Sequence, residues 1–148
     1  MKIFKDNQGR TWTLCINVDA IKRVKAMINV NLLDALDGKL IERLSSDPVL
    51  LCDVIYALLK TDADVLKVTD ENFGQSMSGD AIEAATAALL EELIDFFPQR
   101  RRQILTKALA KIREIETKGM DLADKKMATL NVDSLLSTLS ESSGKQPE

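Results

Sequence analysis

The sequence predicts a mostly α-helical fold: a single helical domain with an N-terminal β-hairpin and a disordered C-terminal tail. Residues 10–16 alternate between apolar and polar side chains directly after a turn, which is typical of a half-buried strand. From residue 17 onward the apolar side chains recur at helical spacing. From residue 131 onward Ser, Thr and Gly accumulate, as in disordered segments. We therefore expect a helical domain over residues 1–130, with the hairpin in residues 1–16, and a flexible tail over residues 131–148.

The predicted hairpin consists of two strands and a turn rich in turn-forming residues. Residues 2–5 form the first strand, residues 6–9 the turn and residues 10–16 the second strand. Trp12, Leu14 and Ile16 share one face of the second strand. An isolated hairpin is only marginally stable in water, so we expect this face to pack on the helices that follow. The outer edges stay open for pairing with another chain.

Capping residues mark the first predicted helices. Asn17 or Asp19 caps a helix that runs to about residue 28, and short helices follow over residues 31–36 and 39–44. Asp47 with Pro48 is typical of a helix start, since proline is favoured at the first helical position. The helix that begins there is expected over residues 49–60. Thr69 is expected to cap a short helix that ends at residue 77.

The most regular predicted helix covers residues 81–97, and Pro98 ends or kinks it. A further helix is expected over residues 100–118, with Leu105, Leu109 and Ile112 buried. Gly119 is expected to stop that helix, because glycine is favoured just beyond a helix C-terminus. A last helix is expected over residues 121–130.

The composition excludes several classes of function. The 148 residues include no histidine, which excludes Ser-His-Asp and Cys-His catalysis and histidine-ligated zinc. The sequence contains neither a nucleophile motif nor a glycine-rich phosphate loop. No apolar run approaches the ~20 residues of a membrane span. We therefore expect no enzymatic activity, no cofactor, no bound metal and no membrane association.

Cys15 and Cys52 are the two cysteines, too few for a disulfide framework. The N-terminal residues do not form a signal peptide, so the sequence predicts a cytoplasmic protein. In that compartment we expect both cysteines to be reduced and buried, as small apolar side chains.

The charges are segregated along the chain. Residues 31–98 hold 14 acidic and 4 basic residues, whereas residues 99–118 hold 7 basic and 2 acidic ones. This pattern favours either internal charge complementarity or association of copies. Acidic residues of the predicted helices could serve as a general acid and base or bind a metal. A metal site between helices also needs ligands on a second helix, and the sequence has no such paired motif. We expect a solvated surface for all of them: Asp62, Asp64, Glu91, Glu92 and Asp95.

Arg100, Arg101 and Arg102 open the basic segment and are candidates for binding a partner. They could contact nucleic-acid phosphates, but no aromatic residue lies among them to stack on a base, which argues against nucleic acid. A solvated face or a contact with an acidic partner is favoured. Phe96 and Phe97 end the preceding helix. They are interpreted either as core residues or as a pair of which one packs across an interface.

Several segments, which span roughly residues 10–115, resemble a family of small proteins from tailed phages and prophages, the tail assembly chaperones of long-tailed phages. The segments that carry the resemblance are Ile21-Lys22-Arg23-Val24, Leu32-Leu33-Asp34, Asp47-Pro48-Val49-Leu50-Leu51, Phe73-Gly74, Gly79-Asp80-Ala81-Ile82-Glu83-Ala84-Ala85, Ala88-Leu89-Leu90-Glu91-Glu92-Leu93, Phe96-Phe97-Pro98 and Arg100-Arg101-Arg102.

The resemblance implies a non-enzymatic protein of the host bacterial cytoplasm. Such chaperones are mostly helical, self-associate into homo-oligomers and coat the tape-measure protein before the tail tube forms around it. In many members a frameshift near the end of the gene adds a C-terminal extension, and Ser143-Gly144-Lys145 permits a slippery codon sequence. The alternatives are a structural tail-completion or connector protein of the virion and a small DNA-binding regulator.

Overall fold

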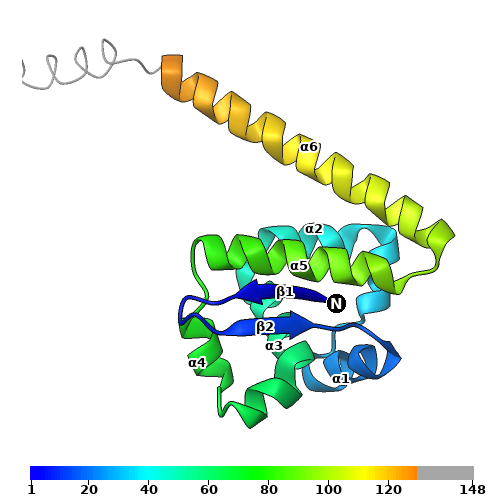
Figure 1. Cartoon of the computed structure of the whole chain (residues 1–148). Helices are drawn as coiled ribbons and strands as arrows, with labels where there is room; N and C mark the ends of the chain where they lie inside the picture. The colour runs from blue at the N-terminus through cyan, green and yellow to red at the C-terminus, as the bar shows by residue number, and fades with distance from the viewer. Residues whose placement is uncertain (130–148) are drawn as a thin grey trace, which may run out of the picture. The chain divides into compact units, whose positions relative to one another are not determined.

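The structure is a computed structural model that describes residues 1–129, so the tail predicted over residues 131–148 lies outside the described residues. The chain divides into two compact units, Met1–Leu109 and Ala110–Glu148, with the boundary inside the last helix. The predicted fold class is confirmed: the described chain is mostly α-helical and begins with an antiparallel β-hairpin (Figure 1).

Two strands, one 3₁₀ helix and six α-helices follow one another in the described residues. In chain order they are β1 (Lys2–Lys5), β2 (Thr11–Leu14), α1 (Val18–Ile28), η1 (Leu32–Asp37), α2 (Lys39–Ser46), α3 (Pro48–Val65), α4 (Asp70–Gln75), α5 (Asp80–Phe96) and α6 (Gln99–Thr129).

The hairpin forms where the sequence predicts it, with a shorter second strand. Lys2 pairs with Leu14, and Phe4 pairs with Trp12. The second strand ends at Leu14, which pairs with Lys2 at the start of β1. Ile16 is nevertheless buried together with Trp12 and Leu14, so the predicted apolar face is confirmed.

Four aromatic side chains join the hairpin to the helices of the first unit. The ring of Phe73 in α4 lies 5.8 Å from that of Trp12, 5.9 Å from that of Tyr56 and 6.5 Å from that of Phe4, between ring centroids. The pairs with Trp12 and Phe4 are edge-to-face, an arrangement that adds to the stabilisation that burial alone provides. β1 runs along α5 and β2 contacts α3, so the hairpin covers both central helices (Figure 1).

The predicted caps are confirmed at three helix starts. The side chain of Asn17, rather than that of Asp19, accepts a hydrogen bond from the backbone N–H of Ala20 and caps α1. Asp47 caps α3, whose first residue is a proline, and Thr69 caps α4. Each cap accepts a hydrogen bond from a backbone N–H that the helix itself leaves unpaired. The few residues around each helix start are therefore enough to predict that start from the sequence.

Helix α3 continues to Val65, past the predicted end at residue 60. Ala63 is fully buried within this added turn, and Lys60 pairs with Asp64 one turn further on, at 2.8 Å. The helix ends where Lys67 adopts a left-handed conformation with φ 58°. There the Val68 N–H donates to the carbonyl of Ala63 and closes the turn.

The predicted break at Gly119 is wrong, because α6 runs without interruption from Gln99 to Thr129. A glycine inside a helix costs about 1 kcal/mol relative to alanine. The neighbours of Gly119 are mainly good helix formers, and no proline follows in the described residues to force an end. Leu105 and Leu109 are buried as predicted, but Ile112 is only half-buried.

The expectation that both cysteines are buried is also wrong. Cys15 is exposed and Cys52 is half-buried, and both are free thiols. Cys15 follows the end of β2, between the buried residues Leu14 and Ile16, so strand-like alternation directs its side chain away from the core.

Candidate partner-binding surface

Helix α6 carries an apolar seam that other described residues leave uncovered. Within the second unit, Ile112, Ile115, Gly119 and Leu122 follow one another in steps of three and four residues, which places them on one side of the helix. Ile115 is 62% exposed and Leu122 is 59% exposed. Contiguous apolar surface of this kind is typical of a site that binds another protein.

Basic side chains run beside the apolar seam. Lys111, Lys118 and Lys125 recur every seven residues along one flank of the helix. Only Lys118 has an ion pair within the described residues, with Glu114 at 2.9 Å one turn earlier. Together the seam and this lysine row form an amphipathic surface, the typical docking surface for another amphipathic helix.

The three candidate arginines lie on the first turn of α6 and are all exposed. Successive residues of a helix point about 100° apart, so the three side chains do not form one common face. The guanidinium of Arg102 donates a hydrogen bond to the backbone carbonyl of Asp95 at 3.1 Å, which ties α6 to the end of α5. Arg100 and Arg101 have no such contact within residues 1–129.

The candidate pair Phe96 and Phe97 divides between surface and core. Their rings lie 5.2 Å apart in an edge-to-face arrangement. Phe97 is only 2% exposed, so its side chain belongs to the core of the first unit. Phe96 is half-buried, and its ring is therefore the one of the two that a partner reaches without opening the fold.

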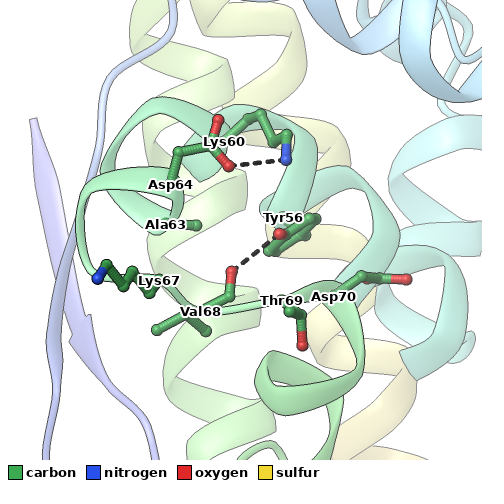
Figure 2. A pocket seen from close by; sticks show the side chains of 8 residues that line it. All are labelled: Tyr56, Lys60, Ala63, Asp64, Lys67, Val68, Thr69 and Asp70. Atoms are coloured by element: carbon green, nitrogen blue, oxygen red, sulfur yellow. Dashed lines mark hydrogen bonds and ion pairs between the residues drawn. The ribbon is translucent and has the colours of Figure 1, made fainter.

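A shallow pocket of about 460 Å³ lies at the C-terminal end of α3 (Figure 2). The Tyr56 hydroxyl donates a hydrogen bond to the carbonyl of Val68 at 2.9 Å. The Lys60 ammonium lies 5.6 Å from the centre of the Tyr56 ring and pairs with Asp64, and that hydrogen bond raises the pKa of Lys60. These polar groups satisfy one another, so the pocket presents no convergent set of free groups to a ligand.

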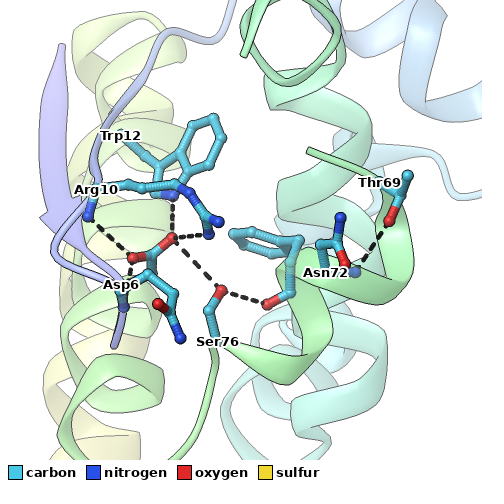
Figure 3. A network of polar contacts seen from close by, with 8 residues as sticks. Asp6, Arg10, Trp12, Thr69, Asn72 and Ser76 are labelled. Carbon is cyan, nitrogen blue, oxygen red and sulfur yellow. Dashed lines mark hydrogen bonds and ion pairs between the residues drawn. The ribbon is translucent and has the colours of Figure 1, made fainter. Parts of the chain in front are cut away.

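Asp6 is the centre of a buried polar network at the hairpin turn (Figure 3). One carboxylate oxygen accepts the backbone N–H groups of Gln8 and Arg10, at 2.9 and 3.0 Å. The other accepts the indole N–H of Trp12 at 2.9 Å and the Arg10 guanidinium at 3.1 Å. Burial raises the pKa of Asp6, but these hydrogen bonds outweigh burial and hold the pKa below its ordinary value of 3.8.

The Asp6 network therefore has a structural role. Every hydrogen bond to the carboxylate comes from the hairpin or from the start of the α4–α5 connection, where the Ser76 hydroxyl lies 3.4 Å away. The neighbouring Asn7 donates its backbone N–H to the Ser76 carbonyl and its side-chain amide to the Ser78 hydroxyl. The turn is thereby fixed to a segment about seventy residues further along the chain.

The expectation of a solvated surface is wrong for Glu92, which is buried in α5. One of its carboxylate oxygens accepts the backbone N–H of Ile16 at 3.3 Å, and the other lies 3.2 Å from the N-terminal ammonium of Met1. The spacing contained a signal for this burial, because positions 88 and 89, one turn earlier on the same face, are apolar and buried.

The other acidic candidates are exposed as predicted: Asp62, Asp64, Glu91 and Asp95. The Lys2 ammonium lies 3.9 Å from a Glu91 oxygen and 3.8 Å from an Asp95 oxygen. Lys2 of β1 thus lies close to two carboxylates on adjacent turns of α5. Among residues 1–129, no three cysteine or acidic side chains come together in an arrangement that could hold a metal ion.

None of the helices in the described part of the chain combines the length and the apolar character that crossing a membrane requires. Comparisons of the whole chain with protein-family models, with curated proteins and with solved structures gave no match.

Proposed function

We propose that this chain is a non-enzymatic tail assembly chaperone of a long-tailed phage or prophage that binds the tape-measure protein during tail morphogenesis in the host bacterial cytoplasm. The observation that carries the proposal is the apolar seam of α6, with Ile115 and Leu122 each more than half exposed. A chaperone needs accessible apolar surface on a stable scaffold. The well-packed first unit supplies the scaffold, and α6 supplies the surface.

A helical surface suits a client that is itself long and helical. An amphipathic helix docks by placing apolar side chains at steps of three and four residues against a matching stripe. The seam offers such a stripe over three turns, and the lysine row beside it attracts acidic side chains of the client. Because the seam includes a glycine and the lysines are solvated, the contact is modest in area and reversible, as a protein that leaves its client requires.

The experiment is co-purification of the tape-measure protein of a long-tailed phage with the tagged full-length chain. The double variant Ile115→Asp/Leu122→Asp places two charges on the seam and is expected to reduce client recovery at least tenfold. The matched control Thr117→Asp adds one charge to the opposite side of the same helix, where Thr117 is exposed, and is expected to retain client recovery. Equal recovery by the wild type and the double variant would contradict the proposal.

A second measurement separates a chaperone from a structural virion protein. Purified phage particles are expected to lack this chain, because an assembly chaperone leaves before the particle is complete. Finding it there in stoichiometric amounts would instead indicate a tail-completion or connector protein. Salt-sensitive binding to duplex DNA that disappears in the triple variant Arg100→Ala/Arg101→Ala/Arg102→Ala would indicate a DNA-binding regulator.

A further inference from the structure

The hairpin is a two-stranded sheet that no third strand extends within residues 1–129. In an antiparallel pair, alternate residues direct their backbone N–H and C=O groups away from the neighbouring strand. The Asp6 N–H donates to the Arg10 carbonyl, and this hydrogen bond fixes the alternation. The backbone groups that then point outward belong to Ile3 and Lys5 in β1 and to Thr11 and Thr13 in β2. Both edges of the hairpin therefore offer backbone donors and acceptors to a further strand.

Helix α5 lies under the inner face of β1. In Figure 1, β1 lies between β2 and α5. Lys2 and Phe4 share the inner face of β1, because side chains alternate along a strand, and Phe4 is buried. The Lys2 ammonium lies 3.9 Å from a Glu91 oxygen and 3.8 Å from an Asp95 oxygen, so α5 is on this inner side. A strand added at the outer edge of β1 would therefore lie over the adjoining side of α5.

The side of α5 next to this edge carries carboxylates at both ends and small side chains between them. At about 100° per residue, the positions that share this side with Glu91 are Asp80, Ala84, Ala87 and Asp95. All of them are exposed except Ala87, which is half-buried. Lys2 supplies one positive charge beside the three negative ones, so this side of α5 is net negative. The alanines between the carboxylates leave room for a strand.

We propose that the outer edge of β1 binds an extended, basic segment of a partner protein as a third strand. The backbone groups of Ile3 and Lys5 pair with those of the segment, as in strand addition at other open sheet edges. Every second side chain of the segment faces α5, where lysine or arginine meets the carboxylates. The intervening side chains lie beside Ile3, which is 65% exposed, so β-branched residues suit these positions.

Charge distinguishes this partner from the remainder of the chain itself. Residues 130–148, which lie outside the described residues, hold three acidic residues and one basic residue, so they match the carboxylates of α5 poorly. The edge of β1 belongs to the first unit and shares no residue with the apolar seam of α6. The inference therefore does not depend on the proposed client.

Amide hydrogen exchange of the full chain, followed by NMR, tests the pairing with a synthetic peptide of alternating lysine and valine. At saturating peptide, exchange of the Ile3 and Lys5 amides is expected to slow about tenfold or more, whereas the amides of Thr11 and Thr13 on the other edge stay unchanged. Two control peptides are expected not to bind. One has N-methylated valines, which cannot donate to the edge, and the other has glutamate in place of lysine.

Three results of this experiment would overturn the proposal. The first is a dissociation constant above about 1 mM for the lysine–valine peptide. The second is protection of Thr11 and Thr13 in place of Ile3 and Lys5. The third is protection of Ile3 and Lys5 without peptide that rises with protein concentration, because a second copy would then occupy the edge.

Charge substitutions on α5 test the choice of a basic segment. Glu91→Ala/Asp95→Ala is expected to raise the dissociation constant of the peptide about threefold or more, because two exposed carboxylates are lost. The matched control Asp34→Ala/Asp62→Ala removes the same charge from exposed positions of η1 and α3 and is expected to bind like the wild type. Equal binding by the wild type and Glu91→Ala/Asp95→Ala would overturn the proposal.

The seam variant of α6 keeps this proposal and the proposed function apart. Ile115→Asp/Leu122→Asp is expected to bind the lysine–valine peptide like the wild type, because the edge of β1 lies in the other unit. Loss of the tape-measure protein with retained peptide binding, or the reverse, would show which of the two proposals fails.

Discussion

The buried carboxylate of Asp6 gives a quantitative test of how the hairpin is held. In Asp6→Asn an amide NH₂ replaces one acceptor oxygen, and the carboxylate charge is lost. Each carboxylate oxygen accepts two N–H donors, so the amide leaves two donors without an acceptor whichever way it turns. With the NH₂ toward Trp12, these are the indole N–H, which donates at 2.9 Å, and the Arg10 guanidinium. An unsatisfied buried donor costs about 1–3 kcal/mol, and a hydrogen bond to a charged group contributes about 1.5–3 kcal/mol. We therefore expect the free energy of unfolding to fall by about 2–4 kcal/mol.

The assay is urea unfolding at pH 7, monitored by circular dichroism. The free energy of unfolding is expected to fall with urea concentration at the same slope in both proteins. Asp19→Asn is the matched control, because Asp19 pairs with Arg23 at the surface. Such exposed pairs contribute less than about 1 kcal/mol, so little change is expected. A double-mutant cycle with Trp12→Phe should show coupling of about 1 kcal/mol or more. A loss below about 0.5 kcal/mol in Asp6→Asn, or strict additivity with Trp12→Phe, would refute the reasoning.

The pH dependence follows from the same contacts. The pKa of Asp6 is held below its ordinary value of 3.8, so the folded state favours the ionised carboxylate. Its contribution to stability is complete above pH 3.8 and is lost as the pH falls through the folded-state pKa. The stability difference between the wild type and Asp6→Asn is therefore expected to narrow below pH 3.8. A difference that stayed constant down to pH 2 would contradict this assignment.

Three further predictions concern other parts of the first unit. Acetylation of the Met1 amine is expected to lower the free energy of unfolding by about 1–3 kcal/mol, because buried Glu92 then loses its cationic partner. In the Glu92→Gln variant, acetylation is expected to leave the free energy of unfolding unchanged. Lys67→Gly is expected to stabilise the protein by about 1 kcal/mol in urea unfolding, because glycine adopts the left-handed φ of 58° without strain; a loss would contradict this. A neutral alkylating reagent is expected to modify Cys15 before Cys52, because Cys15 is exposed and burial raises the pKa of the Cys52 thiol. Mass spectrometry measures the order of modification, and modification of Cys52 first would contradict this prediction.

Residues 1–97 show how far local sequence information reaches. The side chains of Asn17, Asp47 and Thr69 cap helices by bonding backbone groups only two or three residues away, so the starts of three helices could be read directly. The hairpin face of Trp12 and Leu14 likewise follows from simple alternation. These features depend on short-range hydrogen bonds and on the period of apolar residues, both of which the sequence contains.

Features that depend on distant segments could be decided only by the tertiary structure. Asp6 and Glu92 are polar residues in a turn and on a helix, and both are buried where a distant segment lies alongside: the α4–α5 connection beside Asp6 and the hairpin region beside Glu92. The N–H of Ile16 reaches Glu92 across 76 positions of sequence. Helix α6 continues through Gly119 because the helix propensity of the surrounding residues outweighs the free-energy cost of one glycine. The sequence by itself determined the order and the type of the elements, while the tertiary structure decided which charges are buried and which apolar side chains stay exposed, because burial depends on what packs alongside.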